Sequence, residues 1–348
     1  MARRALGCLI VSLLILQGCG SDPEPEPAAA PTAWSVDVEG YDSGLFAVWG
    51  HDDGPLWTVG ADDGKGPLLL THAQGRAGAW ARVDTSAFPG DLWWLHGPDA
   101  QTLYLVGAQG RVVRWQRSGD GGPTGAQGTW TTMPTPTKRV LYGCWAADAS
   151  HIWAVGGDPK GVEAGVVLLS DGVTWTEVTA LPPVPKGVSF FKVFGTSATD
   201  VRVVGVGGTV LHFDGEVWTR EDLKTTQRLI TLHGDGDLQV IVGGTGNGAV
   251  FERDRAASPD SRGTSGWKDV SPEAIQALNG VRLRGGKAWA VGFRGTLVDR
   301  TKTGWELRDE APTSMDLHGV FIDKTGTGWA VGGNLFSQPA SEGVILVR

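Results

Sequence analysis

Short apolar runs that end in Val-Gly recur along almost the whole chain. Each run places aliphatic and aromatic residues over three or four positions before the glycine, which is typical of short β-strands. The seven runs are LWTVG (56–60), LYLVG (103–107), IWAVG (152–156), VRVVG (201–205), QVIVG (239–243), AWAVG (288–292) and GWAVG (328–332). They are spaced 38 to 49 residues apart, so the chain contains seven copies of one unit.

Further predicted strands flank each Val-Gly run. One precedes the run, as LFAVWG (45–50) does in the first unit, and one follows it, as GTVLHF (208–213) does in the fourth. A fourth strand, led by tryptophan, closes six units. These Trp-led strands are AWARV (79–83), TWTTM (129–133), TWTEV (174–178), VWTRE (217–221), GWKDV (266–270) and GWELR (304–308). Seven repeats of four short strands predict an all-β, seven-bladed β-propeller over residues 32–348.

The last unit lacks a Trp-led strand, and the beginning of the folded region supplies one. The seventh unit stops at GVILVR (343–348), whereas AWSVD (33–37) stands alone before the first unit. Pairing these two strands would complete the last blade and cover an edge that is otherwise exposed. We therefore expect a velcro closure, in which the N-terminal strand completes the C-terminal blade.

The chain has sixteen tryptophans, about half of which recur at fixed positions of the repeat. Such recurrence predicts packing between blades. The residues expected to pack in this way are Trp34, Trp80, Trp130, Trp175, Trp218, Trp267 and Trp305. The inner strands also carry an aliphatic row, formed by Val48, Leu95, Cys144, Val193, Leu232, Leu283 and Val320. Because Cys144 occupies an aliphatic position, we expect a small core residue and not a reactive thiol.

A bulkier row directly follows the aliphatic one and is expected near the central channel. Its members are Trp49, His96, Trp145, Phe194, His233, Arg284 and Phe321, of which Trp49, His96, Trp145, His233 and Arg284 are the candidate channel-lining residues. His96 and His233 belong to nearly opposite blades. A shared metal ion needs ligands within about 2 Å, so we expect neither a metal nor a cofactor there.

The N-terminal region predicts export and lipid anchoring. A basic start precedes an apolar run over residues 5–16, which is too short to span a bilayer and typical of a signal peptide. The run ends in Leu-Gln-Gly-Cys, which resembles the lipobox of bacterial lipoproteins. The resemblance implies that residues 1–18 are removed and that Cys19 is lipidated; an ordinary secretory signal is the alternative. Residues 19–31, rich in Pro, Glu and Ala, would form an extended tether.

Charge and sorting signals narrow the location and the partners. Gly20, not aspartate, follows Cys19, and by resemblance to Gram-negative sorting rules this implies the outer membrane, with the acyl chains as the only membrane contact. Loss of Arg3 and Arg4 with the signal would change the formal net charge from −8 to −10. An acidic protein of this kind is a poor nucleic-acid binder. Cys144 would then be the single free cysteine, so no disulfide framework is expected.

The repeats resemble a known group of propellers. Strings such as IWAVGG (152–157) and GVGGTVLHFDGEVW (205–218) look like those of BNR-type propellers, which include photosystem II assembly-factor-like proteins and Trp-rich propeller lipoproteins of myxobacteria. The resemblance covers nearly the whole chain after the tether, and it implies the fold more strongly than any activity. Sialidases belong to the same broad group, but their Asp-box is only partly matched at residues 171–175 and their Arg-Ile-Pro element is absent. We therefore predict a protein that is not an enzyme.

Two functions fit these features. The first is a scaffold or assembly factor that binds another envelope protein through the loops joining each fourth strand to the next first strand. We expect these loops to expose the candidate contact residues, because aromatic and arginine side chains often anchor interfaces. The candidates are Tyr41, Phe88, Lys138, Arg139, Lys186, Phe190, Arg228 and Met315. The second is binding of a carbohydrate or small ligand at the channel mouth. Glycoside hydrolysis there is less favoured, because no paired catalytic carboxylates are evident.

Overall fold

The computed structural model describes residues 33–120, 125–158, 161–256 and 266–348. Residues Thr32–Arg348 form one compact unit. The predicted signal peptide, the lipidation site Cys19 and the tether of residues 19–31 lie outside the described residues. Within the described part of the chain, no helix has the length and apolar character needed to cross a membrane.

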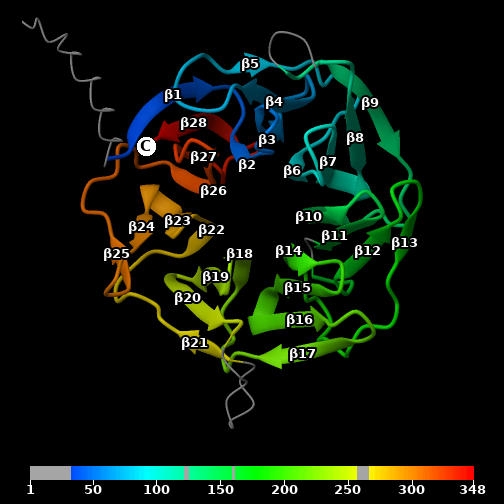
Figure 1. Ribbon diagram of the computed structural model, residues 1–348, viewed down its shortest axis with the longest axis vertical. Helices are drawn as coiled ribbons and strands as arrows, with labels where there is room; N and C mark the ends of the chain where they lie inside the picture. The colour runs from blue at the N-terminus through cyan, green and yellow to red at the C-terminus, as the bar shows by residue number, and fades with distance from the viewer. Residues whose placement is uncertain (1–32, 121–124, 159–160, 257–265) are drawn as a thin grey trace, which may run out of the picture. The chain divides into compact units, whose positions relative to one another are not determined.

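The described residues form seven four-stranded antiparallel sheets, arranged around one axis as the blades of a propeller (Figure 1). The innermost strands are β2 (Leu45–Gly50), β6 (Leu92–His96), β10 (Val140–Asp148), β14 (Phe190–Ser197), β18 (Leu229–Asp235), β22 (Leu278–Arg284) and β26 (Asp316–Ile322). The second strands, which contain the Val-Gly runs, are β3 (Leu56–Asp62), β7 (Thr102–Gly107), β11 (His151–Gly157), β15 (Asp200–Gly205), β19 (Leu238–Thr245), β23 (Lys287–Gly292) and β27 (Gly328–Asn334). This arrangement confirms the predicted seven-bladed propeller.

Two further strands complete each blade. The third strands are β4 (Pro67–His72), β8 (Val112–Arg117), β12 (Val166–Ser170), β16 (Thr209–Phe213), β20 (Asn247–Asp254), β24 (Leu297–Arg300) and β28 (Ser341–Val347). The outermost strands are β5 (Ala81–Arg82), β9 (Gly128–Met133), β13 (Trp175–Glu177), β17 (Trp218–Asp222), β21 (Trp267–Asp269), β25 (Trp305–Leu307) and β1 (Ser35–Tyr41). Each outermost strand overlaps a predicted Trp-led strand.

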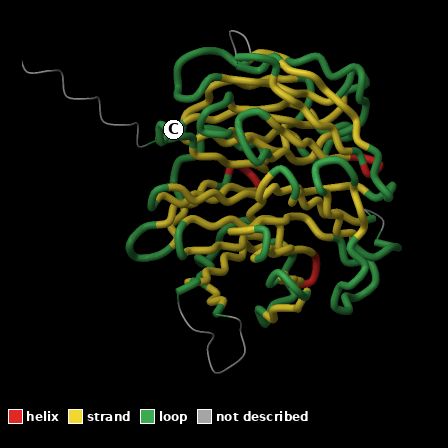
Figure 2. Tube along the Cα trace, turned by 45° about the vertical axis from the view of Figure 1, so that its right-hand side comes forward, coloured by secondary structure: helices red, strands yellow, loops and turns green. Residues whose placement is uncertain are grey.

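The strand directions define two faces of the propeller. We call the face on which the inner strands begin the entry face. Because neighbouring strands are antiparallel, the turns between second and third strands lie on this face as well. Three of these turns are short 3-10 segments, η1 (Ala108–Gly110), η2 (Val206–Gly208) and η3 (Phe293–Gly295). Strands make up most of the body, and the loops gather at its edges (Figure 2).

The velcro closure is confirmed. The last sheet has the order β1-β28-β27-β26, so the first strand of the folded region is the outer strand of the last blade (Figure 1). Ser35 lies opposite Val347 and Glu39 lies opposite Val344. Trp34, directly before β1, is buried. The N-terminal strand therefore pairs an edge of β28 that would otherwise be open.

Tryptophans pack between neighbouring blades, as predicted. In each of four blade pairs, an outer-strand tryptophan lies beside a tryptophan of the neighbouring Val-Gly strand. The ring centroids are 5.3 Å apart for Trp34–Trp289, 5.4 Å for Trp80–Trp329, 6.0 Å for Trp57–Trp130 and 5.5 Å for Trp153–Trp218. These edge-on contacts join the blades laterally. Cys144 is buried in its aliphatic position, and burial raises the pKa of its thiol to about 12, so the thiol is unreactive.

Every inner strand carries a β-bulge near its start. In β2, Leu45 pairs with Gly60 and Ala47 pairs with Val59, which leaves Phe46 as the extra residue. The same shift in the other blades makes Trp93, Tyr142, Phe191, Ile230, Asn279 and His318 the extra residues. A bulge breaks the regular alternation of side chains and can redirect one of them. We refer to these seven side chains as the bulge ring.

The glycine of the Val-Gly repeat lies opposite this bulge. A Cβ atom on Gly156 would lie 1.9 Å from the carbonyl oxygen of Val140, the residue that opens β10. The equivalent distances in the other six blades run from 1.9 to 2.3 Å. No side chain fits at such a distance, so the bulged backbone requires glycine at this position. The repeat that identifies the fold in the sequence is therefore a consequence of the bulge.

Candidate functional site

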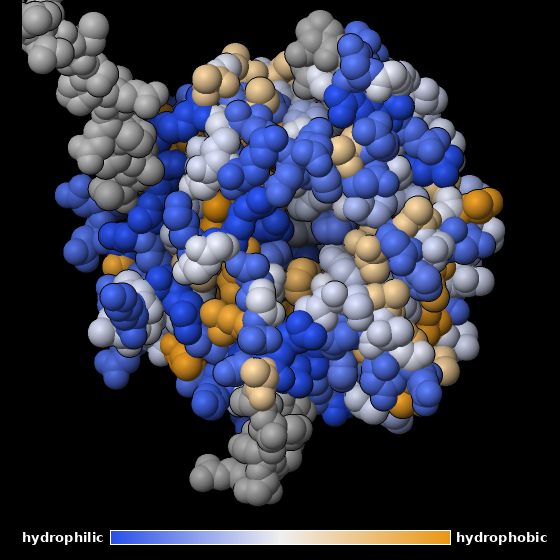
Figure 3. All heavy atoms as spheres, in the orientation of Figure 1, coloured by the Kyte–Doolittle hydropathy of each residue, from blue (hydrophilic) through white to orange (hydrophobic). Residues whose placement is uncertain are grey.

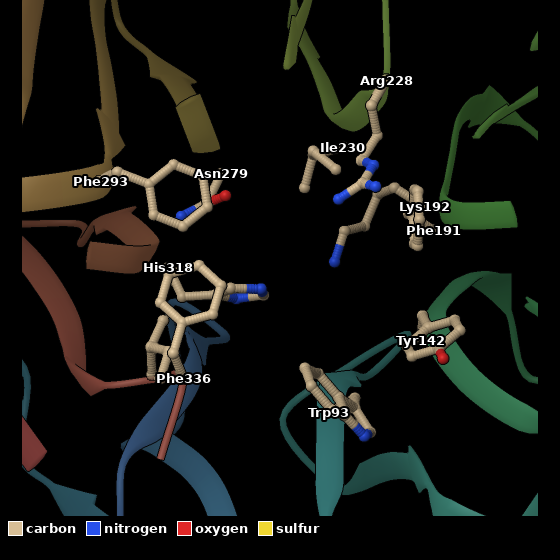
Figure 4. A pocket seen from close by; sticks show the side chains of 11 residues that line it. Trp93, Tyr142, Phe191, Lys192, Arg228, Ile230, Asn279, Phe293, His318 and Phe336 are labelled. Carbon is tan, nitrogen blue, oxygen red and sulfur yellow. The ribbon is translucent and has the colours of Figure 1, made fainter. Parts of the chain in front are cut away.

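A cavity of about 240 Å³ opens on the entry face, where the central channel begins (Figure 4). Its lining residues are Trp93, Tyr142, Phe191, Lys192, Arg228, Ile230, Asn279, Phe293, His318, Leu335 and Phe336. They come from six of the seven blades, and six of them belong to the bulge ring. The space-filling view looks along the same axis as Figure 1, from the side opposite to Figure 4, and it shows a mostly hydrophilic surface with a hollow near its centre (Figure 3).

Aromatic rings form a continuous wall around one half of the cavity. Phe46, the bulged residue of the first blade, is buried and stacks on Trp93 with the ring centroids 4.2 Å apart. Trp93 contacts Tyr142 edge-on at 5.4 Å, and Tyr142 contacts Phe191 at 5.5 Å. Each contact joins two neighbouring blades. The wall therefore holds the cavity in shape and offers flat apolar surfaces to a bound molecule.

The rim of the cavity carries a stacked aromatic pair, of which Phe336 is exposed and Phe293 is half-buried. Phe293 comes from η3, and Phe336 comes from the loop between β27 and β28. Their rings stack with centroids 5.4 Å apart, and Phe336 is 73% exposed. A large aromatic side chain so exposed at a cavity edge is a typical anchor for a binding partner.

Two polar groups of the bulge ring present acceptor atoms. His318 Nδ1 lies 2.6 Å from the carbonyl oxygen of Phe46, which can only accept, so Nδ1 carries the proton. Burial and the nearby Lys192 charge lower the pKa of His318 to about 4, so the ring is neutral at pH 7 and Nε2 is an acceptor. Asn279 Nδ2 donates to the carbonyl oxygen of Leu317 at 2.9 Å, which leaves its amide oxygen as a second acceptor.

Lys192 is the one lysine that lines the cavity among the described residues. Its side chain is only 4% exposed, and its Nζ lies 2.9 Å from the ring centroid of Trp94. Burial lowers its pKa well below the ordinary value of a lysine. The amine points toward the centre of the cavity, on the same side as the guanidinium of Arg228, and His318 faces them from the other side (Figure 4).

The cavity has a basic character in an acidic protein. The formal net charge of the chain is −8, yet no aspartate or glutamate lines the cavity among the described residues. Its basic groups are Lys192 and the exposed Arg228, both on the side of the fourth and fifth blades. A cavity with aromatic walls and two basic groups favours an anionic ligand with apolar parts.

A second ring of side chains surrounds the channel, three residues beyond each member of the bulge ring. It consists of Trp49, His96, Trp145, Phe194, His233, Arg282 and Phe321. From Trp49 through His233 the neighbouring rings have centroids 4.7 to 6.3 Å apart. The Arg282 guanidinium lies 4.4 Å from the ring centroid of Phe321. Six of these seven residues were expected in one row from the sequence.

The prediction that Arg284 belongs to this ring is wrong. In β22, Arg282 pairs with the tryptophan of the Val-Gly strand, just as Trp49 does in β2 and Phe321 does in β26. Arg284 lies two residues further along the strand and pairs with Asp52, with Nη2 and Oδ2 2.6 Å apart.

The physical reason is the position of the first glycine after the ring residue of the sixth blade. In four other blades a glycine directly follows the ring residue, as Gly50 follows Trp49, whereas β22 continues for two residues before its turn at Gly285. If the blades are aligned in sequence on this glycine, the ring position of the sixth blade is therefore placed two residues too late, at Arg284 and not at Arg282. Val281, and not the predicted Leu283, accordingly takes the aliphatic position.

The two channel histidines are hydrogen-bond acceptors. His96 Nδ1 accepts from the backbone N–H of Ala146 at 3.1 Å, and His233 Nδ1 accepts from that of Leu283 at 3.3 Å. Burial and the charge of Arg282 lower the pKa of His96 to about 3, and the same causes lower that of His233. Both are thus neutral and bonded between blades. Among the described residues, no group of three or more His, Cys, Asp or Glu side chains could hold a metal ion.

The eight predicted partner-contact residues are spread over the structure, and one of them lines the cavity. Arg228 lies on the loop that leads into β18 and reaches the cavity. Lys138 and Lys186 are exposed on equivalent loops of the entry face. Arg139 is half-buried and pairs with Glu163 at 3.0 Å. Their role in binding stays a prediction.

Four other predicted contact residues are less accessible. The expectation that Phe88 and Phe190 are exposed is wrong, since they are 4% and 0% exposed. Phe88 packs against Trp130 with centroids 5.7 Å apart, and Phe190 opens β14 in the core row. Tyr41 and Met315 are half-buried and pack against the core. None of these four lines the cavity.

Sequence reasoning missed most of the residues that build the cavity. Phe191 and Tyr142 are bulged residues, and each directly follows the first buried residue of its inner strand. This repeat position could have identified them from the sequence. Lys192 follows the bulge at a position held by Ala47 in the first blade, so the repeat gives no reason to expect a lysine there. Phe336 lies in a loop without a repeat pattern.

Three solved structures share this fold over nearly their whole length. "YCF48 bound to D1 peptide" matches with a TM-score of 0.65 and 13% identity, covering 92% of this chain and 98% of that chain. YCF48 from Cyanidioschyzon merolae matches with a TM-score of 0.62 and 14% identity, covering 90% and 98%. The WD40 β-propeller domain of Doa1 matches with a TM-score of 0.63 and 11% identity, covering 91% and 97%.

The similarity at these identities shows the fold alone. It agrees with the expected resemblance to photosystem II assembly-factor propellers at the level of architecture. No family model and no curated protein matches the chain by sequence.

Proposed function

We propose that this chain is a non-catalytic binding propeller that holds a segment of a partner protein at the mouth of its central channel. The observation that carries the proposal is the cavity on the entry face, where aromatic side chains and two basic groups converge from six blades. The structure named YCF48 bound to D1 peptide supports the idea that a propeller of this shape can bind a peptide. Such a role needs a rigid, preformed surface, which the interlocked bulge ring supplies.

The partner would be another protein of the bacterial envelope. This part of the proposal rests on the sequence, in which Leu-Gln-Gly-Cys at residues 16–19 resembles a lipobox and residues 19–31 resemble a tether. A lipid on Cys19 would hold the propeller at the outer membrane, as in the BNR-type lipoproteins of myxobacteria that the repeats resemble. The acidic net charge argues against nucleic acid as the partner.

Binding is favoured over hydrolysis by the chemistry of the cavity. Glycoside hydrolysis requires two carboxyl groups on either side of the scissile bond. The described residues that line the cavity include neither aspartate nor glutamate. Its polar groups include one amine, one guanidinium, one amide, one imidazole and one phenol, which can orient a ligand. No cofactor is part of the proposal.

Site-specific photo-crosslinking in cells tests this function. A photoreactive phenylalanine analogue is placed at Phe336 on the cavity rim or at Val173, which is 77% exposed in the loop between β12 and β13 on the opposite face. We expect one dominant envelope protein to be captured from position 336 and not from position 173. The same capture should weaken in a Cys19→Ser variant.

Two results would contradict the proposal. Equal capture from positions 336 and 173 would show that the cavity is not the binding surface. Capture of no reproducible protein from position 336 in the lipidated, full-length protein would argue against a protein partner altogether.

A second candidate is a small glycan, favoured by the flat faces of Trp93 and Tyr142 at the cavity wall. Aromatic faces commonly stack on apolar sugar faces, and the polar acceptors could bind hydroxyl groups. A glycan array with the soluble mature chain, together with an assay on generic glycosides, tests it. A blank array without turnover would reject this candidate.

A further inference from the structure

Lys192 is a buried amine that no carboxylate of the described residues contacts. Its side chain is 4% exposed, and its Nζ faces the cavity (Figure 4). Burying an ammonium group without an opposite charge is costly, and a carboxylate placed beside it offsets that cost. An anionic ligand should therefore gain more binding free energy at the buried Lys192 than it would beside an exposed lysine.

The surrounding backbone and an indole hold this amine in place. Lys192 Nζ lies 2.9 Å from the ring centroid of Trp94, two blades away, which favours the charged form through a cation–π contact. The Lys192 side chain can extend across the third blade to Trp94 because residue 143, in the third blade, is glycine. A Cβ atom on Gly143 would lie 3.1 Å from Lys192 Cα and 3.4 Å from its Cδ. Lys192 is thus built into the wall and is not a free surface chain.

The charged and titratable neighbours reinforce a preference for anions. Arg228 is exposed at the rim and has no ion pair among the described residues. His318 and Tyr142 also face the cavity, while Cys144 lies behind Lys192 in the core. No acidic residue opposes Lys192 in this group. The cavity is therefore a local positive region on a chain with a formal net charge of −8.

The other side chains that line the cavity indicate what the rest of the anionic ligand is. Phe191, Ile230, Phe293, Leu335 and Phe336 line the cavity and offer apolar surface to an aryl or branched alkyl group. His318 Nε2 and the Asn279 amide oxygen, on the same side of the cavity as Phe293 and Phe336, are hydrogen-bond acceptors (Figure 4). Acceptors require a donor on the ligand, and a carboxylate has none. A ligand that also satisfies these acceptors therefore carries an N–H or O–H group near its carboxylate.

We propose that the cavity binds an N-acyl amino acid with an apolar side chain, either free or as the C-terminal residue of a polypeptide. Such a ligand carries a carboxylate, an amide N–H and an apolar side chain on one carbon atom. Lys192 binds the carboxylate, His318 or Asn279 accepts from the amide N–H, and the apolar walls hold the side chain. The inference deepens the proposed function and rests on it for the peptide form of the ligand.

Calorimetry with two matched probes tests the carboxylate. The mature chain is titrated with N-acetyl-L-phenylalanine and with N-acetyl-L-phenylalaninamide, which differs by a neutral amide in place of the carboxylate. We expect the acid to bind about tenfold or more tightly than the amide, because a hydrogen bond to a charged group is stronger than a neutral one. Equal affinities, or no binding of the acid, would overturn the proposal.

Three variants separate this role from a structural one. Lys192→Met removes the charge but keeps the length of the side chain, and it should remove most of the difference between acid and amide by weakening acid binding more than amide binding. Arg228→Gln should weaken acid binding by about threefold and reduce its dependence on salt. Lys138→Gln, an exposed lysine of the entry face outside the cavity, should change neither affinity. A Lys192→Met protein that is folded by circular dichroism and still prefers the acid as strongly as the unmodified chain does would contradict the proposal.

A pair of hexapeptides that end in phenylalanine, one as the free acid and one as the amide, identifies the source of the ligand. Tighter binding of the peptide acid than of N-acetyl-L-phenylalanine supports a protein C-terminus, whereas failure of the peptide acid alone supports a free N-acyl amino acid. The result is independent of the crosslinking experiment. Capture of a partner from position 336 without acid selectivity would sustain the proposed function and reject this inference. Acid selectivity without capture of a partner would sustain the inference for a free ligand and reject the proposed function.

Discussion

Ser35 and Val347 are 312 residues apart in the chain and lie opposite each other in one β-ladder. Ser35 Oγ donates a hydrogen bond of 3.3 Å to the Val347 carbonyl oxygen. Through this ladder the first strand of the folded region becomes the outer strand of the last blade, and the ring closes without a covalent bond. The stability of the last blade thus depends on a few residues at the N-terminal end of the propeller.

Trp34 should make a large contribution to this closure. It is 8% exposed and contacts Trp289 of the sixth blade edge-on, with the ring centroids 5.3 Å apart. Trp34→Ala should lower the free energy of unfolding by about 3–5 kcal/mol, measured by urea denaturation. Val36→Ala, on the exposed face of β1, should cost about 1 kcal/mol or less. Similar losses for both variants would show that the closure does not depend on the buried indole.

Gly156 should tolerate no side chain, because the bulge of β10 brings the Val140 carbonyl oxygen to 1.9 Å from the point that a Cβ atom would occupy. Gly156→Ala should lower the free energy of unfolding by about 3 kcal/mol or more. Gly207, with φ of +66° and no atom within 4 Å of a Cβ, provides the control. Gly207→Ala should cost about 1–2 kcal/mol, from the left-handed backbone alone. Thermal unfolding of the two variants side by side would decide the matter, and equal losses would refute the steric explanation.

The blade count and the closure could be predicted from the sequence for a physical reason. The bulged backbone admits only glycine opposite the carbonyl group, so the repeat is preserved even where other residues differ between blades. The missing Trp-led strand of the last unit leaves a single partner, the segment that contains Trp34. Packing of Cys144 follows from the same periodicity, because a repeat position has the same surroundings in every blade.

The cavity could not be predicted, because it depends on departures from the repeat. The repeat glycine marks where a bulge lies but does not determine its side chain, and Asn279 and Phe46 occupy equivalent bulged positions although their side chains have little in common. The sequence pattern places Arg284 in the ring for a similar reason, since no glycine directly follows Arg282 and the first glycine after it is Gly285. Lys192 acquires its role only from Trp94, two blades away in the folded ring.

Arg202 should be held by its acidic partners in the fourth blade. It is 2% exposed, and its guanidinium lies 2.7 Å from Asp200 and 3.1 Å from Glu221, which also accepts from Trp267 Nε1 at 2.8 Å. Arg202→Met leaves the buried Glu221 carboxylate without its cation and should cost about 3–5 kcal/mol in chemical denaturation.

A double variant checks the cause of that loss. Arg202→Met combined with Glu221→Gln removes both charges, and the glutamine can still accept from the Trp267 indole. We expect the double variant to be more stable than Arg202→Met alone, which makes the coupling between the two sites measurable. A double variant that is less stable than Arg202→Met would show that shape, and not the unpaired charge, causes the loss.

His96 should make the propeller less stable in acid. Its Nδ1 accepts the Ala146 N–H, and burial together with the Arg282 charge lowers its pKa to about 3, from an ordinary value near 6.5. Between these two pH values the unfolded chain binds a proton that the folded chain does not. The contribution of His96 to stability is therefore complete above about pH 6.5 and is lost as the pH falls toward 3.

His96→Gln keeps an acceptor for the Ala146 N–H but removes this proton linkage. The difference in stability between the variant and the unmodified chain should therefore shift in favour of the variant from pH 7 to pH 4, as measured by urea midpoints. A difference that stays constant over that range would mean that His96 does not bind a proton on unfolding.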